Sequence, residues 1–221
     1  MGPQEADFHV VGIDLSGPTH ARNTVLVILG SRPNALRKVA SRSGADDRDI
    51  FQSVSQLAQK TLVVVGLDAP LSYHIGGGDR PSDAKLRRKI VQAGMKPGSV
   101  MPPTMTRMAY LTLRGMAVSR SLEQIKGYPV RMVEVHPGAA MALRQGPLEH
   151  VLNFKTSPAS RSALLSWLED QGLHGITSQD RPSDHYVAAC ACALAAWKWH
   201  RGEPAWVVPA RPPYHPYAFA C

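Results

Sequence analysis

The strongest fold signal in the sequence is the stretch VVGIDLSGPT at residues 10–19, where an apolar run ends in Asp14 and a polar turn. An apolar run bounded by turn residues predicts a buried strand, here residues 8–15. A carboxylate at the end of such a strand needs a compensating cation, metal ion or set of hydrogen-bond donors. Alternatively, Asp14 caps the turn through its own side chain.

Two further apolar runs end in the same way. The β-branched run of residues 62–67 leads into Asp68, and residues 130–135 place Glu134 next to the end of a third strand. Open sheets flanked by helices bind their ligands at the carboxyl ends of the strands. We therefore expect Asp14, Asp68 and Glu134 to converge. Carboxylate oxygens suit Mg²⁺ or Mn²⁺, so the pattern predicts a divalent cation site.

Length and composition describe an ordinary globular chain. The 221 residues suit a single domain, and 44% hydrophobic content argues against disorder. The net charge of +8 is compatible with a phosphate-rich partner such as nucleic acid. Three cysteines make no disulfide framework, and no apolar stretch or leader suggests a membrane or secretion. We expect a cytoplasmic protein without a membrane partner.

The remaining periodicities complete an α/β pattern. We expect antiparallel strands at residues 24–29 and 36–40, an edge strand at 205–208, and helices at 46–60, 82–93, 105–120, 157–171 and 186–201. Ser82 and Thr104 are the expected caps of the second and third of these helices. Residues 71–128 then form a helical and loop insertion within one domain. The fold class is a mixed sheet, antiparallel at first and then parallel, flanked by helices.

Two helices also carry polar residues that are candidates for a functional role. The helix at 82–93 presents Lys85, Arg87 and Arg88 on a basic face, which is either simply solvated or a grip for a phosphate backbone. The last helix is almost wholly apolar and small from residue 187 to 196, so it must pack tightly on the sheet. Asp184 and His185 lie in its first turn. Asp184 is there either a dipole partner or a fourth carboxylate of the site.

At this point the order of elements resembles the ribonuclease-H-like fold, in which strands ending in acidic residues are closed by a helix that carries another. The motifs GIDLSG at 12–17, LDAP at 67–70, GDRPSD at 78–83 and EVHP at 134–137, with the Ala-rich last helix, resemble one family, the domain of unknown function 429. Its members are described as predicted nucleases. The resemblance covers residues 8–208.

This resemblance implies metal-dependent phosphodiester hydrolysis. By match, Asp14 bridges two metal ions while Asp68 and Glu134 complete their coordination. The family often carries Asp-Ala in the closing helix where this chain has Ala188 and Ala189, and Asp184 lies one turn earlier. The candidate catalytic residues are thus Asp14, Asp68, Glu134, Asp184 and His185, and the four carboxylates among them are the candidate metal ligands.

The candidate substrate contacts lie on the same motifs and on the basic helix: Ser16, Thr19, Arg80, Lys85, Arg87, Arg88 and His136. His136 or His185 is expected either to move a proton or to act through a hydrogen bond. Two rival hypotheses stay open. Residues 14–19 also resemble the first phosphate loop of actin-like and sugar kinases, which predicts a phosphotransferase or nucleotide hydrolase. The loss of the Asp-Ala pair favours a non-catalytic nucleic-acid-binding protein.

Overall fold

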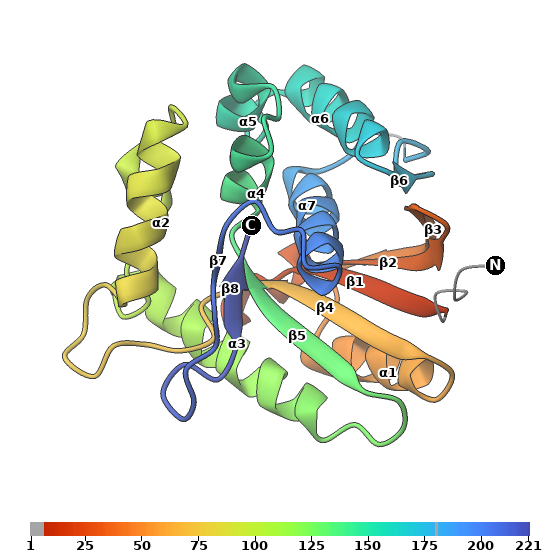
Figure 1. Ribbon diagram of the computed structural model, residues 1–221, viewed down its shortest axis with the longest axis horizontal. Coiled ribbons are helices and arrows are strands. Elements are labelled where there is room, and N and C mark those ends of the chain that lie inside the picture. Colours follow the sequence, from red (N-terminus) through yellow and green to blue (C-terminus); the bar gives the residue numbers. More distant parts are fainter. Residues whose placement is uncertain (1–6, 180) are drawn as a thin grey trace.

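The computed structural model describes residues 7–179 and 181–221, with the backbone but not the side chains of Thr19 and Ala21. In this part of the chain, eight strands form one mixed sheet with the order β6-β3-β2-β1-β4-β5-β8-β7 (Figure 1). The strands are β1 (Phe8–Asp14), β2 (Val25–Arg32), β3 (Ala35–Ser43), β4 (Leu62–Asp68), β5 (Val130–Val135), β6 (Leu173–His174), β7 (Val207–Val208) and β8 (Ala218–Ala220).

The sheet confirms the predicted change from antiparallel to parallel pairing. β1 pairs antiparallel with β2, and β2 with β3, whereas β4 and β5 continue the sheet in parallel. The edge strand β7 was expected at residues 205–208. β6 and β8 were not expected, because strands of two or three residues are too short to show a period of two.

Helices cover both faces of the sheet. They are α1 (Asp47–Ala58), α2 (Pro81–Gln92), α3 (Thr106–Glu123), α4 (Pro137–Leu143), α5 (Leu148–Asn153), α6 (Pro158–Asp170) and α7 (Asp184–His200), with 3₁₀ turns η1 (Pro18–Asn23) and η2 (Pro97–Ser99). One core cluster joins α1 and α3 to the sheet face that carries Val11 and Ile13. A second cluster joins α7, α4 and α6 to the face that carries Val10 and Val64 (Figure 1).

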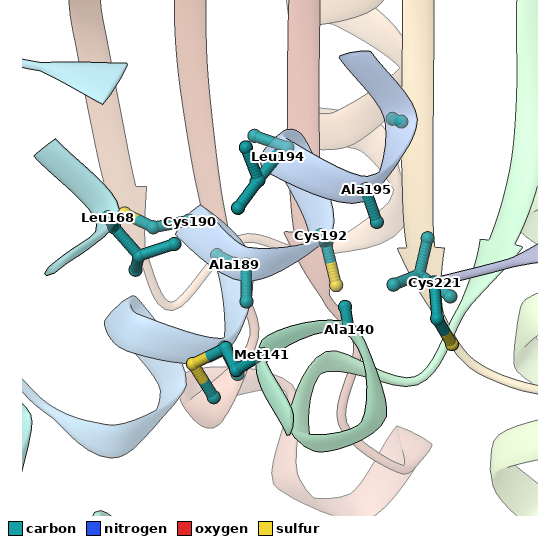
Figure 2. Packing of buried hydrophobic residues seen from close by; sticks show 14 of the residues in the cluster. Ala140, Met141, Leu168, Ala189, Cys190, Cys192, Leu194, Ala195 and Cys221 are labelled. Atoms are coloured by element: carbon teal, nitrogen blue, oxygen red, sulfur yellow. The ribbon is translucent and has the colours of Figure 1, made fainter. Parts of the chain in front are cut away.

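The closing helix α7 lies unusually close to the middle of the sheet. A Cβ atom added to Gly12 of β1 would lie 1.9 Å from the carbonyl oxygen of Ala189, and one on Gly66 of β4 would lie 2.4 Å from that of Cys192. Small residues on both sides therefore allow backbone to meet backbone. Figure 2 shows the other side of the helix, where Ala189 and Cys190 pack beside Met141 and Leu168. This packing fixes the position of the first turn of α7.

Two helix caps differ from the sequence-based expectation, and one helix was not expected. α2 begins at Pro81, and its first turn is closed by Asp83, whose carboxylate accepts from the backbone N–H of Arg80 at 2.8 Å; Ser82 is not the cap. Proline suits the first helical position because it lacks the N–H that would remain unbonded there. α3 begins at Thr106, and the Thr104 hydroxyl instead accepts from the backbone of Gly78. α5 was not expected, since it has only six residues.

Among the described helices, none has both the length and the apolar character that crossing a bilayer requires.

Candidate functional site

Two of the predicted carboxylates lie side by side at the ends of neighbouring strands. Asp14 and Asp68 are register partners in the parallel pairing of β1 with β4. Side chains alternate between the faces of a strand, so Asp14 shares the face of Val10, and Asp68 shares that of Val64. Both carboxylates therefore point to the side covered by α7. They line a cleft of about 610 Å³ to which α2, α5, α7 and β8 also contribute.

The first turn of α7 brings a histidine onto Asp14. His185 Nδ1 lies 2.6 Å from Asp14 Oδ2, and it donates because a carboxylate only accepts. Asp14 is 8% exposed, and His185 is half-buried. This hydrogen bond to Asp14 is the main reason that the pKa of His185 is raised above its ordinary value of 6.5, with burial acting in the opposite direction. This bond occupies Nδ1, so Nε2 is the ring nitrogen that remains for a further contact.

Asp68 is held in an environment that disfavours its charge. Burial raises its pKa well above the ordinary 3.8, and the charge of Asp14 and a hydrogen bond between the two carboxyl groups raise it further. The ammonium of Lys155 acts in the opposite direction. Within the described residues, neither Asp14 nor Asp68 forms an ion pair with Lys or Arg. The pair thus has no Lys or Arg ion-pair partner, and His185 is the ionisable group that the described contacts bond to it.

Glu134 does not join this pair. Its register partner in β4 is Leu67, so its side chain leaves the opposite face of the sheet. Both of its oxygens are taken: Arg80 donates to Oε1 at 2.5 Å and to Oε2 at 2.8 Å, and the backbone of Leu71 donates to Oε2 at 2.9 Å. The three strand-end carboxylates therefore line one cleft, as expected, but Glu134 is bonded to Arg80 and does not share the face of Asp14 and Asp68. Glu134 affects the pKa of Asp68 only as the smallest of the contributing charges.

Arg80 is the centre of a buried ion network rather than an open substrate contact. Its guanidinium also donates to both oxygens of Asp83, at 2.7 and 3.0 Å, and to the Ser72 hydroxyl at 3.2 Å. Arg80, Asp83 and Glu134 are 3%, 1% and 5% exposed. Burial lowers the pKa of Arg80, but the adjacent carboxylates more than offset this and raise it above its ordinary value. Charges this deeply buried are tolerated only when they are paired and hydrogen-bonded.

Both ring nitrogens of His136 are hydrogen-bonded to the protein backbone. Its Nδ1 accepts from the backbone N–H of Ala139 at 3.1 Å, and its Nε2 lies 2.7 Å from the carbonyl oxygen of Ser99. A ring that accepts at Nδ1 and donates at Nε2 is neutral. Burial lowers the pKa of His136, in agreement with that state. The ring lines the cleft and ties α4 to η2, so it acts through hydrogen bonds.

A family model described as "Protein of unknown function (DUF429)" matches residues 12–214. The chain belongs to the DUF429 family. No curated protein and no solved structure matches it. The family resemblance of the sequence motifs is therefore confirmed, while nuclease activity stays a prediction for this DUF429 chain.

The loop after β1 is held by internal contacts in this DUF429 protein. The Ser16 hydroxyl donates to the carbonyl of His20 at 2.7 Å and lies 2.8 Å from the Thr24 hydroxyl. Arg114 from α3, which sequence reasoning missed, donates to the Ser16 carbonyl at 2.7 Å and to Thr24. Ser16 does not line the cleft. The side chain of Thr19 lies outside the described residues.

The basic face of α2 divides into two kinds of cation. Arg87 is paired with Asp79 through both terminal nitrogens and donates to the carbonyl of Val100, so it joins two loops at the cleft. Lys85 and Arg88 are exposed, and neither lines the cleft. Of the three predicted phosphate contacts on this helix, two are therefore available to a large anionic partner on the surface.

Lysine 155 is a cleft residue that the sequence did not reveal. Lys155 follows the unexpected helix α5, lines the cleft, and its charge influences Asp68, His136 and His185 alike. Asp184 also lines the cleft and adds to the rise in the pKa of His185. An isolated Lys in the segment NFKT carries no motif signal, because its position depends on how α5 packs.

The donor set fits one hard cation rather than two. Mg²⁺ is commonly held by one or two carboxylates together with substrate phosphate oxygens, and Asp14 and Asp68 supply two uncompensated carboxylates from adjacent strands. A two-ion site with Glu134 does not fit, since Arg80 occupies both of that side chain's oxygens. Within the described residues, no group of three or more His, Cys, Asp and Glu side chains is arranged as a metal cluster. Further ligands would have to come from water or substrate.

Proposed function

We propose that this DUF429 protein hydrolyses phosphodiester bonds, with Asp14 and Asp68 holding one Mg²⁺ or Mn²⁺ ion. The observation that carries this proposal is the pair of carboxylates, adjacent in register, recessed in a cleft and, among the described residues, without a Lys or Arg ion-pair partner. Like charges held together at a cost in free energy are typical of functional sites. When bound, the cation supplies positive charge against the negative charge that develops on the phosphoryl oxygens.

The chain's own residues have separate roles in the proposed reaction. Asp14 holds His185 by Nδ1, which orients the ring and leaves Nε2 to accept a proton from the attacking water. The ammonium of Lys155 attracts a phosphate oxygen of the substrate. Asp184 favours the protonated form of His185 through its charge. Asp184 thus acts on the proton-transfer residue and is not required as a fourth metal ligand.

The topology supports the finer fold assignment in this proposal. Three antiparallel strands, a helix, and then a parallel strand that ends in a carboxylate follow one another in β1, β2, β3, α1 and β4, and α7 closes the site. This is the order implied by the ribonuclease-H-like resemblance. We propose that the protein has that fold, with a cation site reduced to two carboxylates.

Nucleic acid is the proposed substrate class. The chain carries a net charge of +8, and Lys85 and Arg88 present exposed cations on α2. Such cations bind a phosphate backbone without regard to sequence, and this binding weakens steeply with added salt. The exposed face of α2 would thus attract the polymer, and the cleft that holds Asp14 and Asp68 would perform the chemistry.

Purified protein incubated with single-stranded, double-stranded and hybrid substrates tests this function. Cleavage should need Mg²⁺ or Mn²⁺, stop in EDTA, and fall by at least about 100-fold in Asp14→Asn and Asp68→Asn. Asp170→Asn, which changes an exposed carboxylate at the end of α6, should leave the rate unchanged. Cleavage that persists in Asp14→Asn contradicts the proposal. Nucleotide turnover without cleavage would favour the phosphotransferase, and binding without either activity would favour the non-catalytic protein.

A further inference from the structure

The cleft above the carboxylate pair has an apolar wall that hydrolysis of a phosphate alone does not require. Its lining is mostly aliphatic, thioether or aromatic on the side contributed by α3, α5, β8 and the residues that follow η2 and α5. Such side chains include Val100, Met101, Met108, Leu152, Phe154 and Phe219. A volume of about 610 Å³ lies within the range that encloses a small organic ligand.

The polar and apolar parts of the cleft lie at different depths. Asp14 is only 8% exposed, whereas Met101 and Leu152 are 43% and 46% exposed while lining the same cleft. A phosphate that reaches the carboxylate pair therefore passes exposed apolar side chains as well as the exposed ammonium groups of Lys96 and Lys155. Exposed apolar side chains that face a recessed polar group are typical of a site whose ligand has both a charged and an apolar portion.

Charge in the cleft is opposite to that of the whole chain. Among the described residues that line it, five carboxylates face only three Lys and Arg side chains, although the net charge of the protein is +8. Because Arg80 already binds two of these carboxylates, Asp14, Asp68 and Asp184 remain against Lys96 and Lys155, and a run of phosphates meets an excess of carboxylates there. A single phosphate gains binding free energy if a divalent cation held by Asp14 and Asp68 neutralises it.

We propose that the cleft takes one unstacked nucleotide of a single strand, with its phosphate at the carboxylate pair and its base against the apolar wall. Placement of the phosphate rests on the proposed function. Placement of the base does not, because it follows from the lining of the cleft. In a duplex the faces of the bases are stacked on one another, so only phosphates would meet an apolar wall. A single strand can turn one base out at a small cost in free energy.

Binding distinguishes this proposal from the activity itself. Fluorescence anisotropy in Ca²⁺, which also prefers oxygen ligands, would compare a labelled single-stranded oligonucleotide, the duplex of the same sequence, and a single strand with abasic residues. We expect the single strand to bind at least about tenfold more tightly than the duplex, and the abasic strand to lose most of that advantage. Equal affinity for strand and duplex, or for normal and abasic strands, would overturn the proposal.

Two methionines give a matched pair of variants. Met101→Gln should weaken binding of the normal strand by about fivefold to tenfold and leave the abasic strand unchanged, since only the base contacts this wall. Met105→Gln alters a side chain of similar exposure, 46%, that does not line the cleft, and should change neither. A nucleoside monophosphate that displaces the strand better than ribose 5-phosphate does would identify a free nucleotide as a second source of the same chemistry.

The two proposals fail in different ways. If the strand binds as described but Mg²⁺ and Mn²⁺ give no cleavage, the hydrolase is wrong and the nucleotide site stands. If duplex is cleaved and bound as well as single strand, the hydrolase stands and the nucleotide site is wrong.

Discussion

Two pairs of acidic side chains line the same cleft, and they differ in what neutralises them. Asp83 and Glu134 are both bound to the guanidinium of Arg80, and all three are almost wholly buried. Asp14 and Asp68 lie next to each other, with their side chains on the opposite face of the sheet from Glu134. Among the described ion pairs, their one partner is His185, which is bonded to Asp14. The same functional group therefore has different electrostatic surroundings in the two pairs.

The difference separates structure from chemistry. A carboxylate whose oxygens are all bonded to a fixed cation is stable, but it has no oxygen left for a ligand. A carboxylate held beside another without a cation is costly, and binding a cation removes that cost. The Arg80 network thus holds β5 to the start of α2, and the Asp14–Asp68 pair is the place where a ligand gains most.

The largest effect on stability is expected from removing Arg80, the cation that binds Asp83 and Glu134. Arg80→Met leaves two buried carboxylates without a partner, and should lower the free energy of unfolding by about 3–5 kcal/mol. Urea denaturation followed by circular dichroism measures it. Arg88→Met removes an exposed cation from the same helix and should change stability by less than about 0.5 kcal/mol. Similar values for the two variants would mean that the network contributes little to stability.

The sequence could reveal part of this site because strand ends are local features. Apolar runs that stop at Asp14 and Asp68 identify both residues as strand-end carboxylates without any knowledge of tertiary structure. The face of Glu134 depends on its register against β4, and its pairing with Arg80 joins residues 54 positions apart. Neither is encoded in a local pattern. The sequence therefore suggested three equivalent carboxylates, whereas among the described residues Glu134 is paired with Arg80 and only Asp14 and Asp68 lack a Lys or Arg partner.

The second prediction concerns α7, the helix that brings His185 to Asp14. Gly12→Ala would place a Cβ atom 1.9 Å from the Ala189 carbonyl, so α7 must shift or the sheet must distort. We expect a loss of about 2–3 kcal/mol in the free energy of unfolding. We also expect weaker coupling between His185 and Asp14, visible as a lower pKa of His185 in NMR titration. Gly98→Ala, where an added Cβ meets nothing within 4 Å, is the control.

This contact also explains how far the fold was predictable. The small and apolar composition of residues 187–196 correctly predicted a helix packed tightly on the sheet, because only small side chains permit such an approach. It did not predict where on the sheet the helix lies, which depends on the two strand glycines. The shortest elements, β6, β8 and α5, were missed because they are stabilised by their neighbours and not by local sequence preference.

A third measurement tests the cation site without any substrate. Mg²⁺ or Mn²⁺ at about 100 times its dissociation constant should stabilise the protein by about 2.7 kcal/mol, seen as a rise in the thermal midpoint. Asp14→Asn and Asp68→Asn should each remove most of this gain, whereas Asp170→Asn should keep it. A rise that survives both site variants would place the ion elsewhere. No rise in the wild-type protein would contradict the cation site directly.

The smallest effect is a dependence of stability on pH in EDTA. Because the pKa of Asp68 is raised in the folded protein above the ordinary 3.8, the folded state binds its proton more tightly than the unfolded state. The stability contributed by that proton is full below about pH 3.8 and is lost as pH rises through the raised pKa. Asp68→Asn keeps an N–H that can donate to Asp14 at every pH, so it has no such loss.

The stability of Asp68→Asn relative to wild type should therefore increase from about pH 4 to pH 8, by a difference on the order of 1 kcal/mol. Chemical denaturation at a series of pH values measures it, with Asp170→Asn as the flat reference. A saturating divalent cation should reverse the sign at high pH, because it stabilises the two charged carboxylates that Asn cannot reproduce. If the two variants follow the same line in EDTA, Asp68 carries no excess charge repulsion. The contrast with the Arg80 network would then lie in geometry alone.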